Sequence, residues 1–83
     1  MTINERIIEL GFKQFSDTPG HARYRRRNVE ITVQDSITEW NQFNIYVEVH
    51  KHGHDIELSK HGIKDVDKAI KLIKKFIKKE VGR

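Results

Sequence analysis

The stretch Phe43 to Leu58, with the sequence FNIYVEVHKHGHDIEL, decides the fold of this chain. Its first half alternates apolar with polar side chains, and the alternation resumes at Ile56 in the second half. Period-two alternation rich in β-branched residues is typical of a strand with one buried face. His52-Gly53 lies between the halves, and glycine takes positive φ at little cost. The stretch therefore predicts a β-hairpin.

The buried face also predicts the register of this hairpin. A turn of two residues, or a loop of four, sets Val49 opposite Ile56, whereas a three-residue loop would mix the buried and exposed faces. The favoured register sets Glu48 opposite Glu57, and like charges directly across a sheet are unfavourable. We expect these two carboxylates either to turn into water or to meet a cation.

Three further strands are predicted before the hairpin. Apolar residues alternate with polar ones in both His21 to Arg26 and Val29 to Gln34, but the alternation shifts by one position at Arg27-Asn28. A tight turn at these two residues would bring the apolar side chains of both segments to one face. One long bulged strand is the competing interpretation of the same segment. Lys13 to Ser16 is predicted as a shorter strand, and the proline and glycine in Asp17 to Gly20 favour a turn after it.

A helix is expected at each end of the chain. Thr2 and Glu5 have the spacing of a capping box, and Gly11 is a natural end for the short helix that follows. From about Val66 to Glu80, apolar residues recur at helical spacing, and Asp65 is the expected N-cap.

These elements predict one α+β domain over residues 1–83, in the order α-β-β-β-β-β-α. An antiparallel sheet of four or five strands would form one layer, with both helices packed on one face. Asp35 to Gln42 and Lys60 to Lys64 are expected to be connections. The expected core draws on most elements: Ile7, Phe15, Tyr24, Ile31, Val33, Ile45, Val47, Val49, Ile56, Leu58, Ile70, Ile73 and Ile77. The opposite face of the sheet is expected to be polar: Arg23, Arg25, Glu30, Thr32, Tyr46, Glu48, His50 and Glu57.

Composition limits the class of protein. The 83 residues carry a net charge of +4 and contain no cysteine, which excludes disulfides and thiolate chemistry. No apolar run is long enough to span a bilayer, and the N-terminus resembles a helix start more than a signal peptide. We therefore expect a cytoplasmic protein without membrane contact. Its basic charge suits nucleic acid or an acidic protein surface as a partner.

Two basic segments are candidates for nucleic-acid binding. One is the arginine segment, Arg23, Arg25, Arg26 and Arg27, whose guanidinium groups can form bidentate hydrogen bonds with phosphate or carboxylate. The other is the lysine face of the last helix, where Lys71, Lys75 and Lys78 are the favoured contacts. A solvated outer face is the alternative interpretation of those lysines. Because the arginines are denser, replacing Arg26 and Arg27 is predicted to weaken binding more than replacing Lys75 and Lys78.

Other residues suggest a protein partner. Trp40, beside Ile37 in a connection, either covers the core or anchors a partner, since tryptophan is enriched at binding hot spots. Tyr46 on the polar sheet face is a second candidate for such a contact. Two copies of the chain can also be expected to pair through sheet edges.

The histidines do not predict a metal site. His50, His52 and His54 surround a turn, no cysteine accompanies them, and no carboxylate has a fixed ligand spacing. We therefore expect no bound transition metal and no cofactor.

Several segments in the first half of the chain match a known pattern: Ile7-Ile8, Leu10-Gly11-Phe12, Gly20-His21-x-x-Tyr24-Arg25 and Val29-x-Ile31-x-Val33. This pattern resembles the first half of HicA-type toxins, small mRNA-cleaving proteins with an α-β-β-β-α fold like that of double-stranded-RNA-binding domains. The resemblance implies that His21 acts as a general acid or base, with Arg23 and Arg25 near the phosphate. The chain differs in lacking a serine between Gly20 and His21 and in adding a hairpin after the third strand.

Three functions follow from these observations. The first is a small non-enzymatic binding module that contacts nucleic acid or a nucleoprotein. The second is a protein-interaction or inhibitor module of the phage-accessory type. The third is a HicA-like ribonuclease that uses His21.

Overall fold

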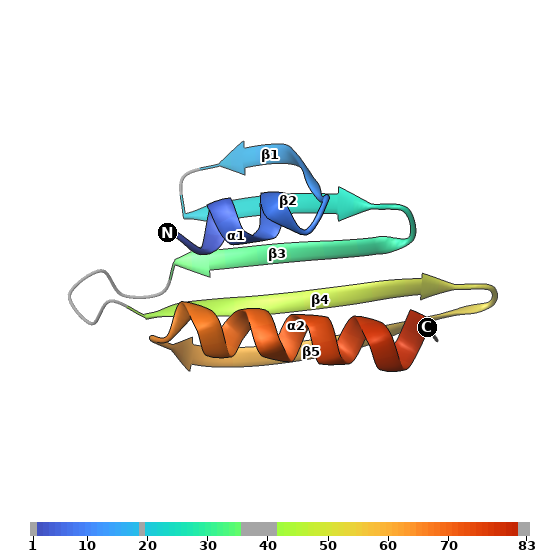
Figure 1. Cartoon of the computed structure of the whole chain (residues 1–83). Coiled ribbons are helices and arrows are strands. Elements are labelled where there is room, and N and C mark those ends of the chain that lie inside the picture. The colour runs from blue at the N-terminus through green and yellow to red at the C-terminus, as the bar shows by residue number, and fades with distance from the viewer. Residues whose placement is uncertain (1, 19, 36–41, 82–83) are drawn as a thin grey trace.

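The computed structural model describes residues 2–18, 20–35 and 42–81. Its elements follow the predicted order: α1 (Ile3–Glu9), β1 (Lys13–Thr18), β2 (His21–Arg26), β3 (Val29–Asp35), β4 (Phe43–Lys51), β5 (His54–Ile63) and α2 (Val66–Val81). All five strands form one antiparallel sheet in the order β1-β2-β3-β4-β5. Both helices lie on one face of it, α1 over the β1–β3 half and α2 over β4 and β5 (Figure 1). The predicted α+β architecture is confirmed, with five strands.

The hairpin of β4 and β5 has the predicted register. Val49 pairs with Ile56, and Val47 pairs with Leu58. Gly53 in the turn has a φ of 88°, a conformation that costs glycine less than any residue with a Cβ atom. The buried face of β4 excludes a one-residue slip because the slip would carry every apolar side chain to the other face.

The turn between β2 and β3 is also confirmed, so the interpretation as one long bulged strand is wrong. Tyr24 pairs with Ile31 across the two strands, as predicted. Arg27 takes a φ of 55° in the turn. Asn28 holds the turn against β4, because its carbonyl accepts a hydrogen bond from the backbone N–H of His50 at 2.8 Å.

Both predicted helix caps are present. Thr2 Oγ1 accepts a hydrogen bond from the Glu5 backbone N–H at 3.1 Å, and the Glu5 carboxylate accepts one from the Thr2 N–H at 2.8 Å. Asp65 Oδ1 accepts from the backbone N–H of Asp67 at 2.9 Å. The Asp67 side chain in turn accepts from Arg6 at 2.5 Å, which ties α2 to α1.

The core lies between the two helices and the sheet. Its buried side chains come from both helices, from β2 to β4 and from the segment that enters β1: Ile3, Ile7, Phe12, Ala22, Tyr24, Val29, Ile31, Val33, Phe43, Ile45, Val47, Val49, Ala69, Ile70 and Ile73. Most of the predicted core is therefore confirmed. Ile56, Leu58 and Ile77 are only half-buried. The first two belong to the edge strand β5, and Ile77 lies in the last part of α2.

The prediction that Phe15 is a core residue is wrong. The register between β1 and β2 shifts between Gln14 and Ser16, so Phe15 is an extra residue in a bulge. Its side chain is 44% exposed and contacts arginines on the face of the sheet that the helices leave open. Phe12, which the core prediction omitted, is 2% exposed and takes an interior position instead.

The prediction that Lys60 to Lys64 is a connection is also wrong, because β5 continues to Ile63. A second register shift lies between Phe43 and Ile45 on β4, so that Phe43 pairs with Ile63. The segment has no clear alternation in its sequence, and the backbone of β4 supplies the pairing that extends the strand.

Most of the predicted connection, Asp35 to Gln42, falls on residues 36–41, which lie outside the described ranges, whereas Asp35 is the last residue of β3. The expectation for Trp40 as a core cover or an anchor therefore stays a prediction. Among the residues that the structure does describe, no helix is both long and apolar enough to cross a membrane.

Candidate functional site

The four arginines of the predicted patch do not share one surface. Arg23 and Arg25 lie at alternate positions of β2 and contact residues on the open face of the sheet. Arg26 directly follows Arg25 in the strand, so its side chain lies on the other face of the sheet, where it contacts the end of α1. Arg27 lies in the turn that follows. The period of two in a strand thus divides the segment between two surfaces.

Arg23 and Arg25 are bound to a carboxylate of their own sheet. Glu30 on β3 accepts from Arg23 Nη2 at 2.5 Å and from Arg25 Nη2 at 3.3 Å. The guanidinium carbons lie 5.0 and 4.7 Å from the centroid of the Phe15 ring. Glu30 is 5% exposed, and it is the single buried charged residue in the described part of the chain. These two arginines are therefore less available to phosphate than their sequence density suggests.

The pKa of Glu30 depends on two opposing effects. Burial raises the pKa of this carboxyl, but the hydrogen bonds from Arg23 and then Arg25 outweigh burial and hold the pKa below its usual value of 4.5. A carboxyl whose pKa is lower in the folded state than in the unfolded state stabilises the fold. This stability is fully present above the unfolded-state pKa and is lost as the pH falls through the folded-state pKa.

We expect Glu30→Gln to lower the free energy of unfolding by about 1 kcal/mol near neutral pH, because the amide forms weaker hydrogen bonds with the two guanidinium groups. Urea unfolding of both proteins at several pH values measures this difference, which should shrink in acid because wild-type Glu30 then becomes protonated. Glu9→Gln, at an exposed position of α1, is the matched control. A difference between Glu30→Gln and wild type that stays constant down to about pH 3 would contradict the assignment.

Arg26 fastens the end of α1 to the sheet. Its Nη1 donates to the carbonyl of Leu10 at 2.5 Å, and its guanidinium carbon lies 5.0 Å from the centroid of the Phe12 ring. An aromatic face attracts a cation at this distance. The Arg26 charge is thus held in one place at the surface, where only part of its hydrogen-bonding capacity is used.

Two hollows meet beside Arg26, and we call them together the basic groove. Their volumes are about 400 and 340 Å³, and both are lined by Arg26, Ile77 and Lys78. The remaining lining residues are Leu10, Phe12, Arg27, Asn28, Val29, Lys74 and Val81. The groove has a largely apolar floor and a cationic rim, and none of its described lining residues is acidic.

The groove brings together residues that are about fifty positions apart in the chain. Arg26, Arg27 and Lys78 were predicted as binding residues, although for two separate segments. Lys74 belongs to the predicted lysine face but was not one of its favoured contacts, and its position one helical turn before Lys78 is the signal that could have singled it out. Lys71 and Lys75, which were predicted contacts, do not line the groove.

His21 lies at the start of β2 and is exposed. With Asn4, Asp17 and Thr18 it lines a small hollow of about 120 Å³. Within the described ranges, no hydrogen bond or ion pair fixes its ring, whereas a general acid or base needs a defined orientation toward its substrate. The role that the resemblance implies for His21 stays a prediction.

Tyr46 lies in β4, on the open face, and is half-buried. Its hydroxyl donates to Oε1 of Gln34 at 3.1 Å and lies 3.2 Å from Nε2 of His61. The Tyr46 and His61 rings meet edge to face with centroids 5.6 Å apart. Tyr46 is therefore held in place and presents an ordered surface to any partner on this face.

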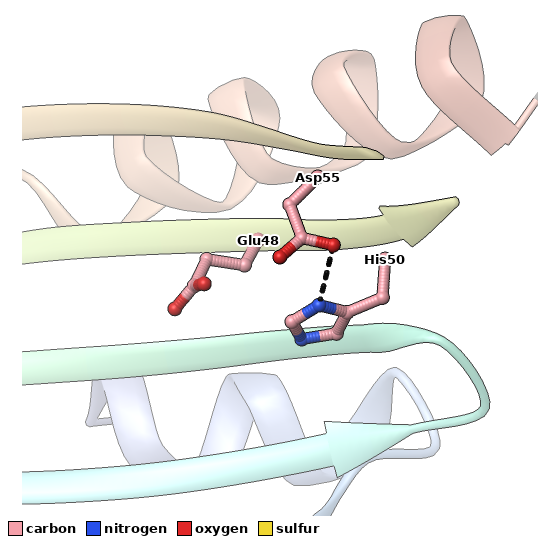
Figure 2. Close-up of side chains that lie close together, drawn as sticks. All are labelled: Glu48, His50 and Asp55. Atoms are coloured by element: carbon pink, nitrogen blue, oxygen red, sulfur yellow. Dashed lines mark ion pairs between the residues drawn. The ribbon is translucent and has the colours of Figure 1, made fainter. Parts of the chain in front are cut away.

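A cluster that the sequence argument missed forms near the tip of the long hairpin. Ligand atoms of Glu48, His50 and Asp55 lie within 4.8 Å of one another, and Nδ1 of His50 lies 3.0 Å from Oδ1 of Asp55 (Figure 2). His50 and Asp55 are cross-strand neighbours, so the predicted register could have revealed the pair. His52 and His54 do not join this cluster. The expectation that no transition metal binds stays a prediction.

Comparison with protein-family models found no match for this chain, and neither did comparison with curated proteins or with solved structures. Two surfaces of the molecule are therefore candidates for function, the basic groove on the helix side and the open face of the sheet.

Proposed function

We propose that this protein is a non-enzymatic binding module that holds nucleic acid in the basic groove. The observation that carries the proposal is the convergence of two distant basic segments on the same hollows. Arg26 and Arg27 come from the β2–β3 turn region, and Lys74 and Lys78 come from α2. Four cations around one concave surface, with no acidic residue among the described lining residues, match the charge of a phosphate backbone.

The floor of the groove strengthens this attraction. Leu10, Ile77 and Val81 line it with apolar atoms, and low-dielectric walls focus the field of charges of one sign. Because the Arg26 guanidinium is already oriented by Leu10 and Phe12, little side-chain entropy is lost when it meets a phosphate.

The salt dependence of binding tests this proposal. If four cations contact phosphates, a plot of the logarithm of the association constant against the logarithm of the salt concentration should have a slope of about −3 to −4. We expect the double variant Arg27→Asn, Lys78→Gln to weaken binding and to make the slope shallower by about one to two units. Asparagine is chosen because it tolerates the positive φ at position 27. Arg26 is left unchanged because its contacts are also structural.

The matched control is Lys64→Gln with Lys68→Gln, which removes the same charge near the start of α2, outside the groove. Filter-binding titrations with a short single-stranded and a short duplex oligonucleotide, at several salt concentrations, measure all three proteins. Equal losses in both variants would show diffuse attraction over the whole surface and would contradict a defined groove. Absence of binding at low salt would contradict the nucleic-acid function. Cleavage of RNA that disappears in His21→Ala would support the ribonuclease instead.

A further inference from the structure

The open face of the sheet carries charges that are sorted by strand. Five residues lie directly across from one another, one on each strand from β1 to β5: Lys13, Arg25, Glu30, Glu48 and Glu57. The two cations occupy the β1–β2 side, and the carboxylates occupy β3 to β5. Cross-strand neighbours share a face, so this row forms one line of charge across the sheet.

Only the middle of this row is neutralised within the chain. Arg23 and Arg25 bind Glu30, but among the described residues neither Glu48 nor Glu57 forms an ion pair, and neither does Lys13. Glu48 and Glu57 are direct neighbours, and their like charges repel. The row therefore leaves a cation on one edge of the face and unpaired carboxylates on the other.

We propose that the open face binds the open face of a second copy of this chain, related by a two-fold axis parallel to β3. Such a rotation exchanges β1 with β5 and β2 with β4 and keeps each position along the strands. It sets Lys13 against Glu57 of the second copy, and Arg25 against Glu48. Glu30 then faces its own counterpart at the axis, but this carboxylate is buried and already paired with Arg23 and Arg25. A two-fold axis across the strands would instead set like charges together, so the charge pattern selects the first axis.

The size of the face suits a modest dimer. Five strands at about 4.8 Å spacing, each about 25 Å long, offer about 600 Å² per copy, or about 1,200 Å² in total. That is the lower end of the range for specific interfaces. Phe15, which is 44% exposed, and the half-buried Tyr46 supply aromatic area on the same face. The basic groove lies on the helix side, so dimerisation and nucleic-acid binding use different surfaces.

Charge reversal tests this arrangement. We expect wild-type protein at concentrations on the order of 100 µM and low salt to sediment as a dimer. Lys13→Glu and Glu57→Lys should each weaken self-association at least about tenfold, because each sets two like charges together in the homodimer. An equimolar mixture of the two variants should form a heterodimer, because both contacts then join opposite charges.

The two substitutions should not harm the monomer. Lys13 and Glu57 are exposed, Glu at position 13 would face Arg25 of its own chain, and Lys at position 57 would remove the repulsion with Glu48. Thermal melting followed by circular dichroism checks that both variants fold. Lys79→Glu on the exposed side of α2 is the control of equal charge change, and it should dimerise like wild type.

Analytical ultracentrifugation decides among the outcomes. A wild-type monomer at all concentrations up to millimolar would overturn the proposal. Single variants that dimerise as tightly as wild type would overturn it, and so would a mixture of the two variants that fails to associate. Loss of dimer in each single variant, together with its recovery in the mixture, would establish the interface and its axis.

Discussion

Replacing Ile73 with alanine is expected to lower the free energy of unfolding by about 2–4 kcal/mol. Ile73 projects from α2 into the core and is 1% exposed, so the substitution removes buried methylene groups and leaves a cavity. A domain of this size is stabilised by only about 4–12 kcal/mol in total. The single change would therefore remove a large part of the stability.

Ile8→Ala is the matched control, because Ile8 is also a helical isoleucine but is 46% exposed. It should cost less than about 1 kcal/mol. Urea unfolding of each variant measures the difference through the midpoint and the slope. If Ile73→Ala does not fold, Ile73→Val should still show a cost of about 0.5–1.5 kcal/mol. Equal effects at positions 73 and 8 would contradict the packing of α2 on the sheet.

Replacing Phe12 with alanine is expected to cost about 3–5 kcal/mol, the largest effect of any substitution considered. Phe12 is 2% exposed, and its ring also carries the guanidinium of Arg26. Its loss would open the core where α1 meets the sheet and would free the side chain that binds the carbonyl of Leu10.

Phe15→Ala provides the comparison that tests the bulge in β1. Phe15 is exposed on the open face, so its replacement should cost no more than about 1 kcal/mol, mainly through lost contacts with Arg23 and Arg25. Thermal and urea unfolding of both variants measure the two effects. A larger cost for Phe15→Ala than for Phe12→Ala would show that Phe15 is a core residue and that the bulge is absent.

The features that the amino-acid sequence predicted correctly depend on neighbouring residues. The alternation in β4 and β5 led to their register, because a slip by one residue would expose the whole apolar face. The caps at Thr2 and Asp65 follow from the need of the first helical N–H groups for acceptors close by. Each of these features involves a short segment, so a single sequence contains the information that they require.

Other features required the three-dimensional arrangement. Phe15 is the one apolar residue of the predicted strand Lys13 to Ser16, and only the pairing of β1 with β2 shows that it lies in a bulge and on the open face. Lys60 to Ile63 have no strand pattern of their own, and β4 supplies the hydrogen-bonding partners that extend β5.

The composition of the two candidate binding surfaces, the basic groove and the open face, depended most on tertiary structure. The alternation in β2 and β3 already grouped Arg23 and Arg25 with Glu30 on one face, but nothing local indicates that Arg26 would lie beside Lys78, because core packing decides where α2 lies. The row from Lys13 to Glu57 likewise exists only when all five strands are in register. Sequence periodicity decides which side chains are buried, whereas the register and the packing of α2 decide which charges meet.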